Sequence, residues 1–516
     1  MRLVRLACCA ALAALLCGCA SLPPMPERAD GPALPVAEHG RLGQGVARAA
    51  AAHPGKTGVL ALTDPLDAFA ARMLLAGAAE RSLDLQYYLW HDDTTGALLL
   101  EALRRAAARG VRVRLLLDDN GAAGLDATLA ALAAQPHFEV RLYNPNAQRE
   151  ARLLGLLADF GRLNRRMHNK SFTADGAATI VGGRNIGDEY FGAGDAVVFA
   201  DLDVLAVGAA VDEVSAEFER YWRSASAYPV SSLVQAPSDA AVRQALVRLQ
   251  AAPAAPEAQR YLQRVRAEPF VPALLAGSLP LEWTAAQLFY DDPVKTLDPA
   301  LADDRLLLGD LLRSVGPAKH GFDLVSPYFV PGAEGSAALV GLARSGVRVR
   351  VLTNSLAASD VAAVHAGYAK WREDLLRGGV QLYEFKPSAV AEAARAGRRS
   401  LSGSSTAALH AKTFAVDGQQ LFVGSFNFDP RSARLNTEMG LLMASPQLAG
   451  ELGRAFDREI AFVAYEVVLD AQGSGLVWIE RSRDGHERRH LTDPQTSIWL
   501  RGGVGFLSIL PIDWLL

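Results

Sequence analysis

The sequence predicts an α/β protein made of two homologous domains. Two observations predict this fold: a strand–helix–strand pattern occurs twice, and a motif of histidine, lysine and aspartate also occurs twice. The chain of 516 residues is long enough for a duplicated domain with a linker and tails. Hydrophobic residues make up 50% of the chain and charged residues 21%, which excludes a disordered chain.

The first repeat has the sequence RGVRVRL at residues 109–115 and SGVRVRV at residues 345–351, 236 residues later. Each copy follows a helix-like stretch, and each stretch follows a strand-like run. The helix-like stretches are residues 96–109 and 335–345, and the strand-like runs are residues 83–88 and 322–326. Strand, helix and strand form a βαβ unit, which joins parallel strands by a crossover helix. The long spacing excludes a solenoid.

These repeats predict the domain organisation. We expect a first domain at residues 59–225 and a second at residues 301–465. The segment between them, residues 226–300, either covers the cleft or only connects the domains. Residues 466–516 are expected to form a C-terminal hairpin and an apolar tail.

All four cysteines lie within the first 19 residues, in a segment that resembles a bacterial lipoprotein signal. A basic start precedes an apolar run that is too short to span a bilayer. We expect a signal peptide at residues 1–18, a lipidated Cys19 and a tether at residues 19–58. An ordinary signal peptide with incidental cysteines is the alternative. Ala20 favours the outer membrane over the inner one by resemblance to sorted lipoproteins, which places the protein in the cell envelope, facing the periplasm.

Charge and cysteine content exclude several classes of function. The long remainder of the chain has no cysteine, which excludes a disulfide framework, a thiolate zinc site and a cysteine nucleophile there. The net charge of −4 gives no support to a basic nucleic-acid-binding surface, so no nucleic-acid partner is expected.

The second repeat contains the candidate catalytic residues. Residues 168–175 (HNKSFTAD) match residues 410–417 (HAKTFAVD), so both have the form H-x-K-x4-D. The chain has only seven lysines against 45 arginines, yet two of the lysines occupy equivalent places in the two copies. Such a coincidence is improbable by chance. The candidate catalytic residues are His168, Lys170, Asp175, His410, Lys412 and Asp417.

The spacing of each motif predicts a hairpin. Asp-Gly pairs at residues 175–176 and 417–418 separate apolar runs, which favours two-residue turns. Counting back from such turns places His168 opposite Gly183 and His410 opposite Ser425. Each of these small residues leaves room for a substrate, and an asparagine lies just beyond on the same side. The substrate-binding candidates are Gly183, Asn185, Ser425 and Asn427. The two aspartates, Asp175 and Asp417, either stabilise the turns or take part in catalysis.

An imidazole, an ammonium and an amide on one surface suit an anionic tetrahedral group. Two such sets can bind a phosphodiester from both sides. One histidine attacks phosphorus and the other protonates the departing alcohol, while the lysines and asparagines stabilise charge on the equatorial oxygens. No metal or other cofactor is expected, since two ammonium groups would repel a cation.

The duplicated motif and its flanking runs resemble the phospholipase D superfamily, and within it the bacterial cardiolipin synthase C type. The matching runs are residues 163–172, 181–193, 424–432 and 510–516, and the resemblance extends from about residue 65 to the C-terminus. It implies two α/β/α sandwich domains with mixed sheets in a bilobal, pseudo-two-fold monomer. One active site then lies at the interface between the domains.

The resemblance also implies an activity. It implies phosphatidyl transfer between membrane phospholipids through a phosphohistidine, with phosphatidylglycerol as acceptor and phosphatidylethanolamine or a second phosphatidylglycerol as donor. An acidic residue past each motif orients a histidine; by matching, these are Glu438 and Asp201, with Asp203 as a competitor for the second place. In the superfamily the N-terminal histidine usually attacks, which favours His168. The sequence departs from the usual cardiolipin synthase in its N-terminal segment, and we expect a lipid anchor at Cys19 to take the place of the usual pair of transmembrane helices.

Two other functions remain open from the sequence. Hydrolysis of a lipid or nucleic-acid phosphodiester would use the same residues, although the acidic chain and the lipid anchor argue against a nuclease. A non-catalytic lipoprotein is the third hypothesis, and two intact motifs argue against it.

Some further signals have less specific interpretations. Residues 486–490 match H-E-x-x-H, but their context predicts a strand, on which histidines four apart do not share one zinc. The apolar residues 507–516 either dip into a membrane or pack in the core. Arg162, Arg165 and Arg166 either meet lipid phosphates or form a solvated face, and residues 87–88, two tyrosines, are interpreted as strand core.

Overall fold

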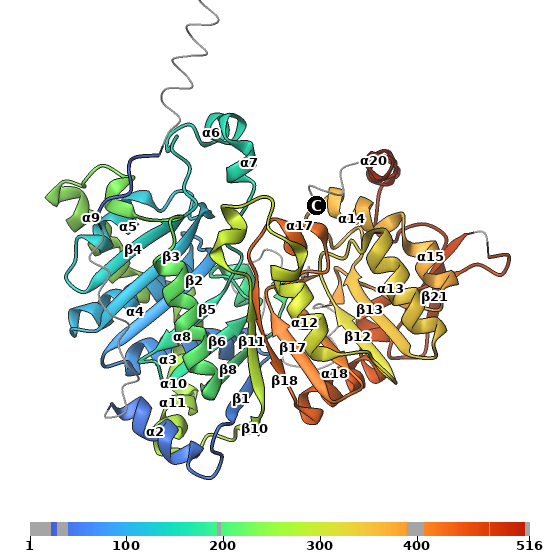
Figure 1. Ribbon diagram of the computed structural model, residues 1–516, viewed down its shortest axis with the longest axis horizontal. Coiled ribbons are helices and arrows are strands. Elements are labelled where there is room, and N and C mark those ends of the chain that lie inside the picture. The colour runs from blue at the N-terminus through green and yellow to red at the C-terminus, as the bar shows by residue number, and fades with distance from the viewer. Residues whose placement is uncertain (1–21, 28–39, 193–197, 390–406, 474, 511–516) are drawn as a thin grey trace, which may run out of the picture.

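The computed structural model describes residues 22–27, 40–192, 198–389, 407–473 and 475–510. The predicted signal peptide, Cys19, part of the tether and the last six residues of the tail lie outside these ranges. Figure 1 shows two lobes side by side, each built around one sheet. The strands of the first predicted domain lie in one lobe and those of the second in the other, and the bounds of the two domains stay a prediction.

The first sheet has nine strands in the described part of the chain. Their spatial order is β10 (Glu282–Thr284), β1 (Thr57–Leu62), β8 (Asp203–Gly208), β6 (Ala178–Gly182), β5 (Ser171–Ala174), β2 (Ser82–Leu89), β3 (Arg112–Gly121), β4 (Phe138–Tyr143) and β9 (Ala227–Pro229). Strands β2, β3 and β4 are parallel, and their other neighbours are antiparallel.

The second sheet has ten strands among the described residues. Their order is β11 (Ala286–Tyr290), β18 (Met439–Met443), β17 (Gln420–Gly424), β16 (Lys412–Val416), β12 (Gly321–Val325), β13 (Arg348–Asn354), β14 (Gln381–Phe385), β19 (Ala464–Leu469), β20 (Leu476–Arg481) and β21 (Glu487–His490). Strands β12, β13 and β14 are parallel. The run from β18 to β19 repeats the order and directions of the run from β8 to β9, so the predicted mixed α/β duplication is confirmed.

The helices cover both faces of each sheet. Helix α3 (Pro65–Ala78) begins at an Asp64 cap, whose carboxylate accepts the Leu66 and Asp67 N–H groups. It packs with α4 (Thr94–Ala108) over one face of the first sheet, while α8 (Ala209–Trp222) covers the other. The other helices of this lobe are α2 (Arg41–Ala50), α5 (Asp126–Ala133), α6 (Arg152–Ala158), α7 (Phe160–Leu163), α9 (Asp239–Ala251), α10 (Gln259–Ala267) and α11 (Phe270–Ala276).

The helices of the second lobe follow the same plan. Helix α13 (Gly332–Arg344) joins β12 to the parallel β13, as α4 joins β2 to β3, which confirms both predicted βαβ units. Helix α18 (Pro446–Arg458) is the counterpart of α8, since each follows the last strand of its motif region. The others are α12 (Leu307–Val315), α14 (Ala362–Ala369), α15 (Arg372–Arg377), α17 (Pro430–Arg434), α19 (Ile460–Val463) and α20 (Ile498–Ser508).

An apolar core joins the two lobes. Val181 and Val204 of the first sheet pack in one buried cluster with Val423 and Leu441 of the second, together with residues of α8 and α18. Burial of apolar surface is the main favourable term in such an association. The two sheets therefore share a core, and the lobes lie side by side across it (Figure 1).

The connecting segment belongs to both sheets. Strand β10 pairs with β1 at the edge of the first sheet, and β11 pairs with β18 at the edge of the second. Residues 226–300 therefore continue the backbone pairing of both domains, a role that neither sequence-based alternative included. The C-terminal strands β20 and β21 extend the second sheet through β19, in a hairpin, as predicted. No helix in the described ranges is long and apolar enough to cross a bilayer.

Candidate active site

Each motif histidine is held by a carboxylate from the other lobe. Nδ1 of His168 lies 2.8 Å from Oε2 of Glu438, and Nδ1 of His410 lies 2.6 Å from Oδ2 of Asp201. Both rings are largely buried. An Nδ1–H donated to a carboxylate leaves the lone pair or proton of Nε2 for chemistry. Asp203, the competing residue, pairs instead with Arg72 and Arg184.

Backbone hydrogen bonds also cross between the lobes, in the same symmetric way. The N–H of His168 donates to the carbonyl of Thr437, and the N–H of His410 donates to the carbonyl of Ala200. Each accepting residue directly precedes the carboxylate that holds the same histidine. Strands β7 (Val198–Ala200) and β15 (Ala407–Leu409) form a parallel pair between the lobes on the second side. Each half of the site is therefore completed by the opposite domain.

The two lysines lie beside the histidines. Nζ of Lys170 donates to the carbonyl of His168 at 2.6 Å, and Nζ of Lys412 lies 2.5 Å from the carbonyl of His410. Burial lowers the pKa of Lys412 to about 8 and holds that of Lys170 well below its usual value. Two buried ammonium groups in one site favour the binding of an anion.

Aromatic rings enclose the histidines, and the sequence did not single them out for this role. The ring of Tyr88 lies 5.0 Å from that of His168, edge to face. Tyr190 and Phe199 lie 5.1 and 5.0 Å from His410. Tyr87 is core, as predicted, but the next residue on the same strand points to the opposite face. That alternation was the available signal for Tyr88.

The two asparagines are buried near the histidines. Nδ2 of Asn185 donates to the hydroxyl of Tyr190 at 2.9 Å, while its Oδ1 has no hydrogen-bond partner in the described part of the chain. Oδ1 of Asn427 is also without one there. Buried polar atoms are usually paired, so these unpaired oxygens identify positions at which a bound substrate can contribute donors.

Burial and charge give the two carboxylates different pKa values. Burial raises the pKa of Glu438 to about 7, against the opposing charge of Lys170. Burial also acts to raise the pKa of Asp201, but the charge and hydrogen bond of His410 outweigh it and lower this pKa to about 2. Asp201 is therefore fully ionised at neutral pH, whereas Glu438 is near its midpoint.

The two histidines also differ in the charges that set their pKa values. Burial, followed by the charges of Lys170 and Lys412, lowers the pKa of His168 well below its usual value. Burial and Lys412 also lower the pKa of His410, but here the charge of Asp201 opposes them. The arrangement favours a neutral His168, and it supports a protonated state better at His410.

The motif aspartates lie outside this cluster. Each occupies a turn with positive φ at the end of its hairpin, with the length of a strand between it and its histidine. The carboxylate of Asp175 accepts the N–H groups of residues 80–82, and that of Asp417 accepts those of residues 319–321. These contacts are those of turn and strand-end residues, and they favour the turn role among the two roles that the sequence left open.

The hairpin register differs by one residue from the prediction. Ala174 pairs with Ala178 and Val416 with Gln420, so three residues rather than two separate the paired positions. The predicted pairing of His168 with Gly183 and of His410 with Ser425 is therefore wrong, and both histidines precede the paired strands.

Gly183 and Ser425 contact the carboxylates and are not placed as openings for a substrate. A Cβ at Gly183 would lie 2.1 Å from Oδ1 of Asp201, so only glycine admits the approach of this carboxylate. The hydroxyl of Ser425 donates to Oε2 of Glu438 at 2.5 Å. The equivalent positions 183 and 425 thus both contact the carboxylate that holds a histidine, one by leaving space for it and the other by a hydrogen bond.

The connecting segment supports Glu438 from behind. Oδ2 of Asp291 accepts both the N–H of Glu438, at 3.0 Å, and Nζ of Lys295, at 2.8 Å. Lys295 also donates to the carbonyl of Ser432. These buried groups fix the strand that carries the carboxylate, and nothing in their local sequence indicated this contact.

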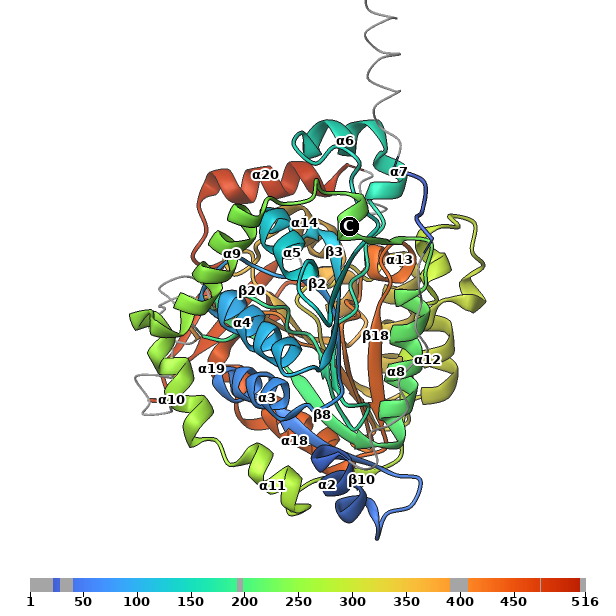
Figure 2. The same ribbon diagram turned by 90° about the vertical axis from the view of Figure 1, so that its left-hand side faces the viewer.

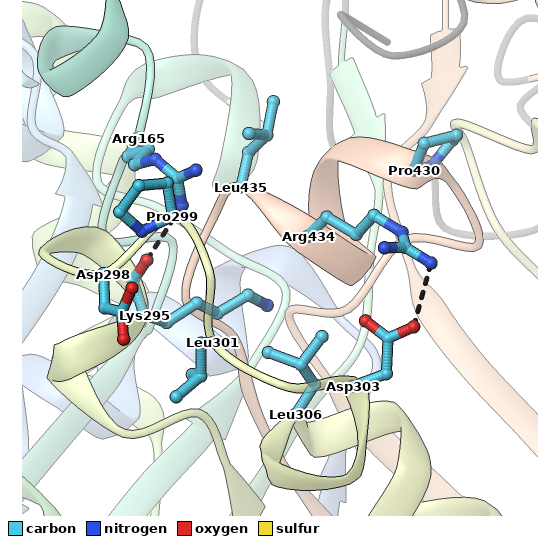
Figure 3. A pocket seen from close by; sticks show the side chains of 10 residues that line it. All are labelled: Arg165, Lys295, Asp298, Pro299, Leu301, Asp303, Leu306, Pro430, Arg434 and Leu435. Atoms are coloured by element: carbon cyan, nitrogen blue, oxygen red, sulfur yellow. Dashed lines mark hydrogen bonds and ion pairs between the residues drawn. The ribbon is translucent and has the colours of Figure 1, made fainter.

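A cavity of about 250 Å³ lies beside α17, as Figure 3 shows. It is lined by Arg165, Lys295 and Arg434 among others, and Arg434 forms an ion pair with Asp303. None of the motif residues lines it, so the phosphodiester chemistry is not placed there.

Of the basic cluster predicted before the first motif, Arg166 forms a buried ion pair with Asp118 and therefore fits neither a lipid-facing nor a solvated role.

Among the described residues, one group of side chains could hold a metal ion. His91, Asp93 and Glu189 have ligand atoms within 4.8 Å of one another. Nδ1 of His91 pairs with Glu189 at 3.1 Å, and Asp93 accepts backbone N–H groups as a helix cap. The H-E-x-x-H residues lie on and just before strand β21, as predicted, so the two histidines do not share the one helix face that a zinc site of this type needs.

The fold and the paired histidines define a phospholipase D-like protein with two domains. The family model "Cardiolipin synthase, PLD-like domain" matches residues 74–222 and 311–460, one segment in each lobe. Cardiolipin synthase C of Escherichia coli (strain K12) is 47% identical over 484 residues, which are 92% of this chain and 100% of that protein. The chain therefore belongs to the cardiolipin synthase family of phospholipase D-like proteins.

Other relatives are more distant. An uncharacterized protein of Helicobacter pylori (strain ATCC 700392 / 26695) is 30% identical over 464 residues, 89% of each chain. The solved structure of phosphatidylserine synthase from Haemophilus influenzae Rd KW20 has a TM-score of 0.52 and 14% identity, covering 82% of this chain and 91% of that one. This likeness shows the shared fold.

Proposed function

We propose that the protein transfers a phosphatidyl group between membrane phospholipids and so makes cardiolipin. The acceptor is phosphatidylglycerol, and the donor is phosphatidylethanolamine or a second phosphatidylglycerol. The observation that carries this proposal is the pair of buried histidines, each held at Nδ1 by a carboxylate of the opposite lobe. The identity to cardiolipin synthase C over almost the whole chain supports the choice of substrates.

His168 is the proposed nucleophile. Its depressed pKa leaves it neutral, with Nδ1–H donating a hydrogen bond to Glu438 and the Nε2 lone pair available. Attack forms an N–P bond as the bond between phosphorus and the donor headgroup oxygen breaks. The two lysines neutralise the charge on the equatorial phosphoryl oxygens, and the side-chain amides of Asn185 and Asn427 contact the substrate.

His410 is the proposed general acid. The ionised Asp201 stabilises its imidazolium, which gives a proton to the departing headgroup oxygen. In the second step the hydroxyl of phosphatidylglycerol attacks phosphorus, His410 takes its proton, and the N–P bond breaks. The histidine at position 168 is then free for another turnover.

The place of action follows from the substrates. We expect the chain to be anchored through Cys19 in the bacterial envelope, facing the periplasm, with the outer membrane favoured. We expect the protein to be a monomer. Release of a Cys19→Ala variant from the membrane fraction, with wild-type protein retained, tests the anchor.

The activity is tested with purified protein in the absence of divalent metal. The protein is incubated with phosphatidylglycerol alone and then with phosphatidylethanolamine added, and the products are separated by mass. Cardiolipin supports transfer, and the mixture that gives more of it identifies the donor. Phosphatidic acid as the sole product would show that water, rather than a lipid hydroxyl, resolves the intermediate, and transfer would be refuted.

A further inference from the structure

Two groups of exposed apolar side chains lie at one end of the molecule. The first is on α6 and α7 in the first lobe and the second is on α20 in the second lobe. Figures 1 and 2 place these three helices at the same end, uppermost in both views. The apolar end, as we call it, consists of Leu153, Leu154, Leu157, Phe160, Ile498, Trp499, Phe506 and Ile509. Leu157 is 70% exposed and Trp499 is 87% exposed.

This end is also the edge at which the histidines lie. Helices α6 and α7 are inserted between β4 and the first motif, and α7 ends five residues before His168. In the second lobe, the side chain of Asn354, the last residue of β13, bonds both backbone groups of Leu409, which precedes His410. Helix α14 follows β13, and α20 packs on α14 through Val504. Each apolar helix is thus attached to the site edge of its own sheet.

The exposed apolar side chains of α20 belong to an amphipathic helix whose other face is packed. Helix α20 is amphipathic: Val504 and Leu507 pack on α14, while Trp499 and Phe506 point away. A side chain such as tryptophan, with an apolar body and one N–H, suits the boundary between headgroups and acyl chains. A helix of this kind lies in the plane of a bilayer interface rather than crossing it.

We propose that the apolar end is a membrane-docking face that seats the active site on the bilayer surface. The occupant we assign is a bilayer containing anionic phospholipid, and this assignment rests on the proposed function, whose two substrates are both bilayer lipids. Docking through both lobes would place the interdomain site over the headgroups, so that donor and acceptor need only move part of the way out of the membrane.

The position of the N-terminal segment supports a membrane as the occupant. Both views show the dark-blue segment of residues 22–27 with its upper end at the level of α6 and α7, from which it runs downward. The predicted lipidation site, Cys19, lies three residues before Leu22, a span of about 10 Å at most for an extended chain. An acyl anchor attached there would enter the bilayer at the apolar end itself.

The charge near the apolar end is complementary to an anionic surface. Of the five arginines in residues 149–166, four pair with carboxylates of Asp118, Asp119 or Asp159, so the charge that this stretch can offer to a surface comes from Arg165. Within the described residues no carboxylate lies within ion-pair distance of Arg165, close after α7, or of Arg501 on α20; they donate to backbone or hydroxyl oxygens. Arginines at the edge of an apolar helix face can meet lipid phosphates.

Quenching of Trp499 tests the docking directly. Full-length protein is mixed with vesicles of phosphatidylglycerol and phosphatidylethanolamine whose acyl chains carry bromine. We expect wild-type fluorescence to be quenched and the quenched component to disappear in Trp499→Phe. Equal quenching in the two proteins would overturn the proposal, because Trp499 would then not enter the membrane. This assay needs no turnover, so it is independent of the proposed function.

Rates on two forms of substrate provide the second test. In Leu153→Ser/Leu157→Ser and in Trp499→Ser/Phe506→Ser, transfer on vesicles should fall about tenfold, while transfer between short-chain lipids dissolved as monomers stays unchanged. The matched control is Leu312→Ser on α12, 58% exposed and away from the apolar end, which should change neither rate. Equal loss on both substrates would overturn the proposal, as would a lipid-free dimer that the variants dissociate.

Discussion

Asp201 and Glu438 occupy equivalent positions beside the two histidines but differ in charge at neutral pH. Asp201 also accepts the N–H of Leu202, so its ionised form is well satisfied. Oε1 of Glu438 has no hydrogen-bond partner in the described part of the chain, and its Oε2 accepts from Ser425 and His168. A neutral carboxyl can keep both contacts at Oε2. The pair therefore combines one permanent negative charge with one adjustable group.

This asymmetry predicts unequal effects of two conservative substitutions. Asp201→Asn removes the charge that supports the His410 imidazolium, and we expect kcat to fall about 10³–10⁴-fold. Glu438→Gln resembles the neutral form of Glu438, and we expect a loss of about tenfold. Steady-state rates of cardiolipin formation, with circular dichroism as the folding control, measure both. Equal losses would show that the two carboxylates carry the same charge during turnover.

Glu217 is a buried carboxyl beneath the first motif. Its oxygens lie 2.7 Å from Nδ2 of Asn169 and 2.5 Å from the side-chain amide of Gln86. Asn169 lies between the motif histidine and lysine and accepts the Thr437 hydroxyl from the other lobe. Burial, opposed by these hydrogen bonds, raises the pKa of Glu217 to about 8. The Oε1 atom of Gln86 has no hydrogen-bond partner among the described residues. The short contact between this side-chain amide and Glu217 therefore fits a protonated Glu217 carboxyl.

The raised pKa predicts how stability changes with pH. Between the pKa of about 4.5 in the unfolded chain and about 8 in the folded one, the folded state retains a proton that the unfolded state releases. The unfolding free energy of wild type should therefore fall relative to that of Glu217→Gln as pH rises through this window, by at most about 1.4 kcal/mol per pH unit. Urea unfolding from pH 5 to pH 9 measures the difference.

The control for this experiment is Glu257→Gln, which alters an exposed glutamate. It should leave the pH dependence of wild type unchanged. A constant difference between wild type and Glu217→Gln across the pH range would contradict the assignment of a neutral Glu217.

At the scale of elements, each motif hairpin is fastened to the strand beside it by its turn aspartate. The Asp-Gly pairs have φ values of 53° and 62° in the first turn and 54° and 63° in the second. Asp and Gly tolerate this left-handed conformation, and the carboxylate then reaches the N–H groups that start β2 or β12. The lengths of strand and turn thus hold the histidine at the opposite end of the hairpin in place.

Removing one of these carboxylates should affect stability more than chemistry. In Asp175→Ala, three backbone N–H groups lose their acceptor, and we expect the unfolding free energy to fall by about 1–3 kcal/mol. The value of kcat per folded molecule should stay within about threefold of wild type. Denaturant unfolding and active-site-normalised rates test both parts. Normal stability with lost turnover would instead make Asp175 catalytic.

At the scale of the whole molecule, the sequence was informative where the two halves repeat each other. The βαβ units, the hairpins and the two histidines were predictable because local pattern sets local structure. The exchange of Glu438 and Asp201 between the lobes was not, because it depends on how the sheets pack at the shared core. The strands of the connecting segment and the support from Asp291 depend on the same packing.

The exchange of carboxylates predicts the outcome of mixing two inactive variants. His168→Ala and His410→Ala should each lower turnover at least about 10⁴-fold, since one lacks the nucleophile and the other the acid. In a monomer both histidines and both carboxylates come from one chain, so an equimolar mixture should stay inactive. Cardiolipin formation measures the rates, and circular dichroism checks that both variants are folded. Activity recovered on mixing would show that two chains exchange lobes and build the site together.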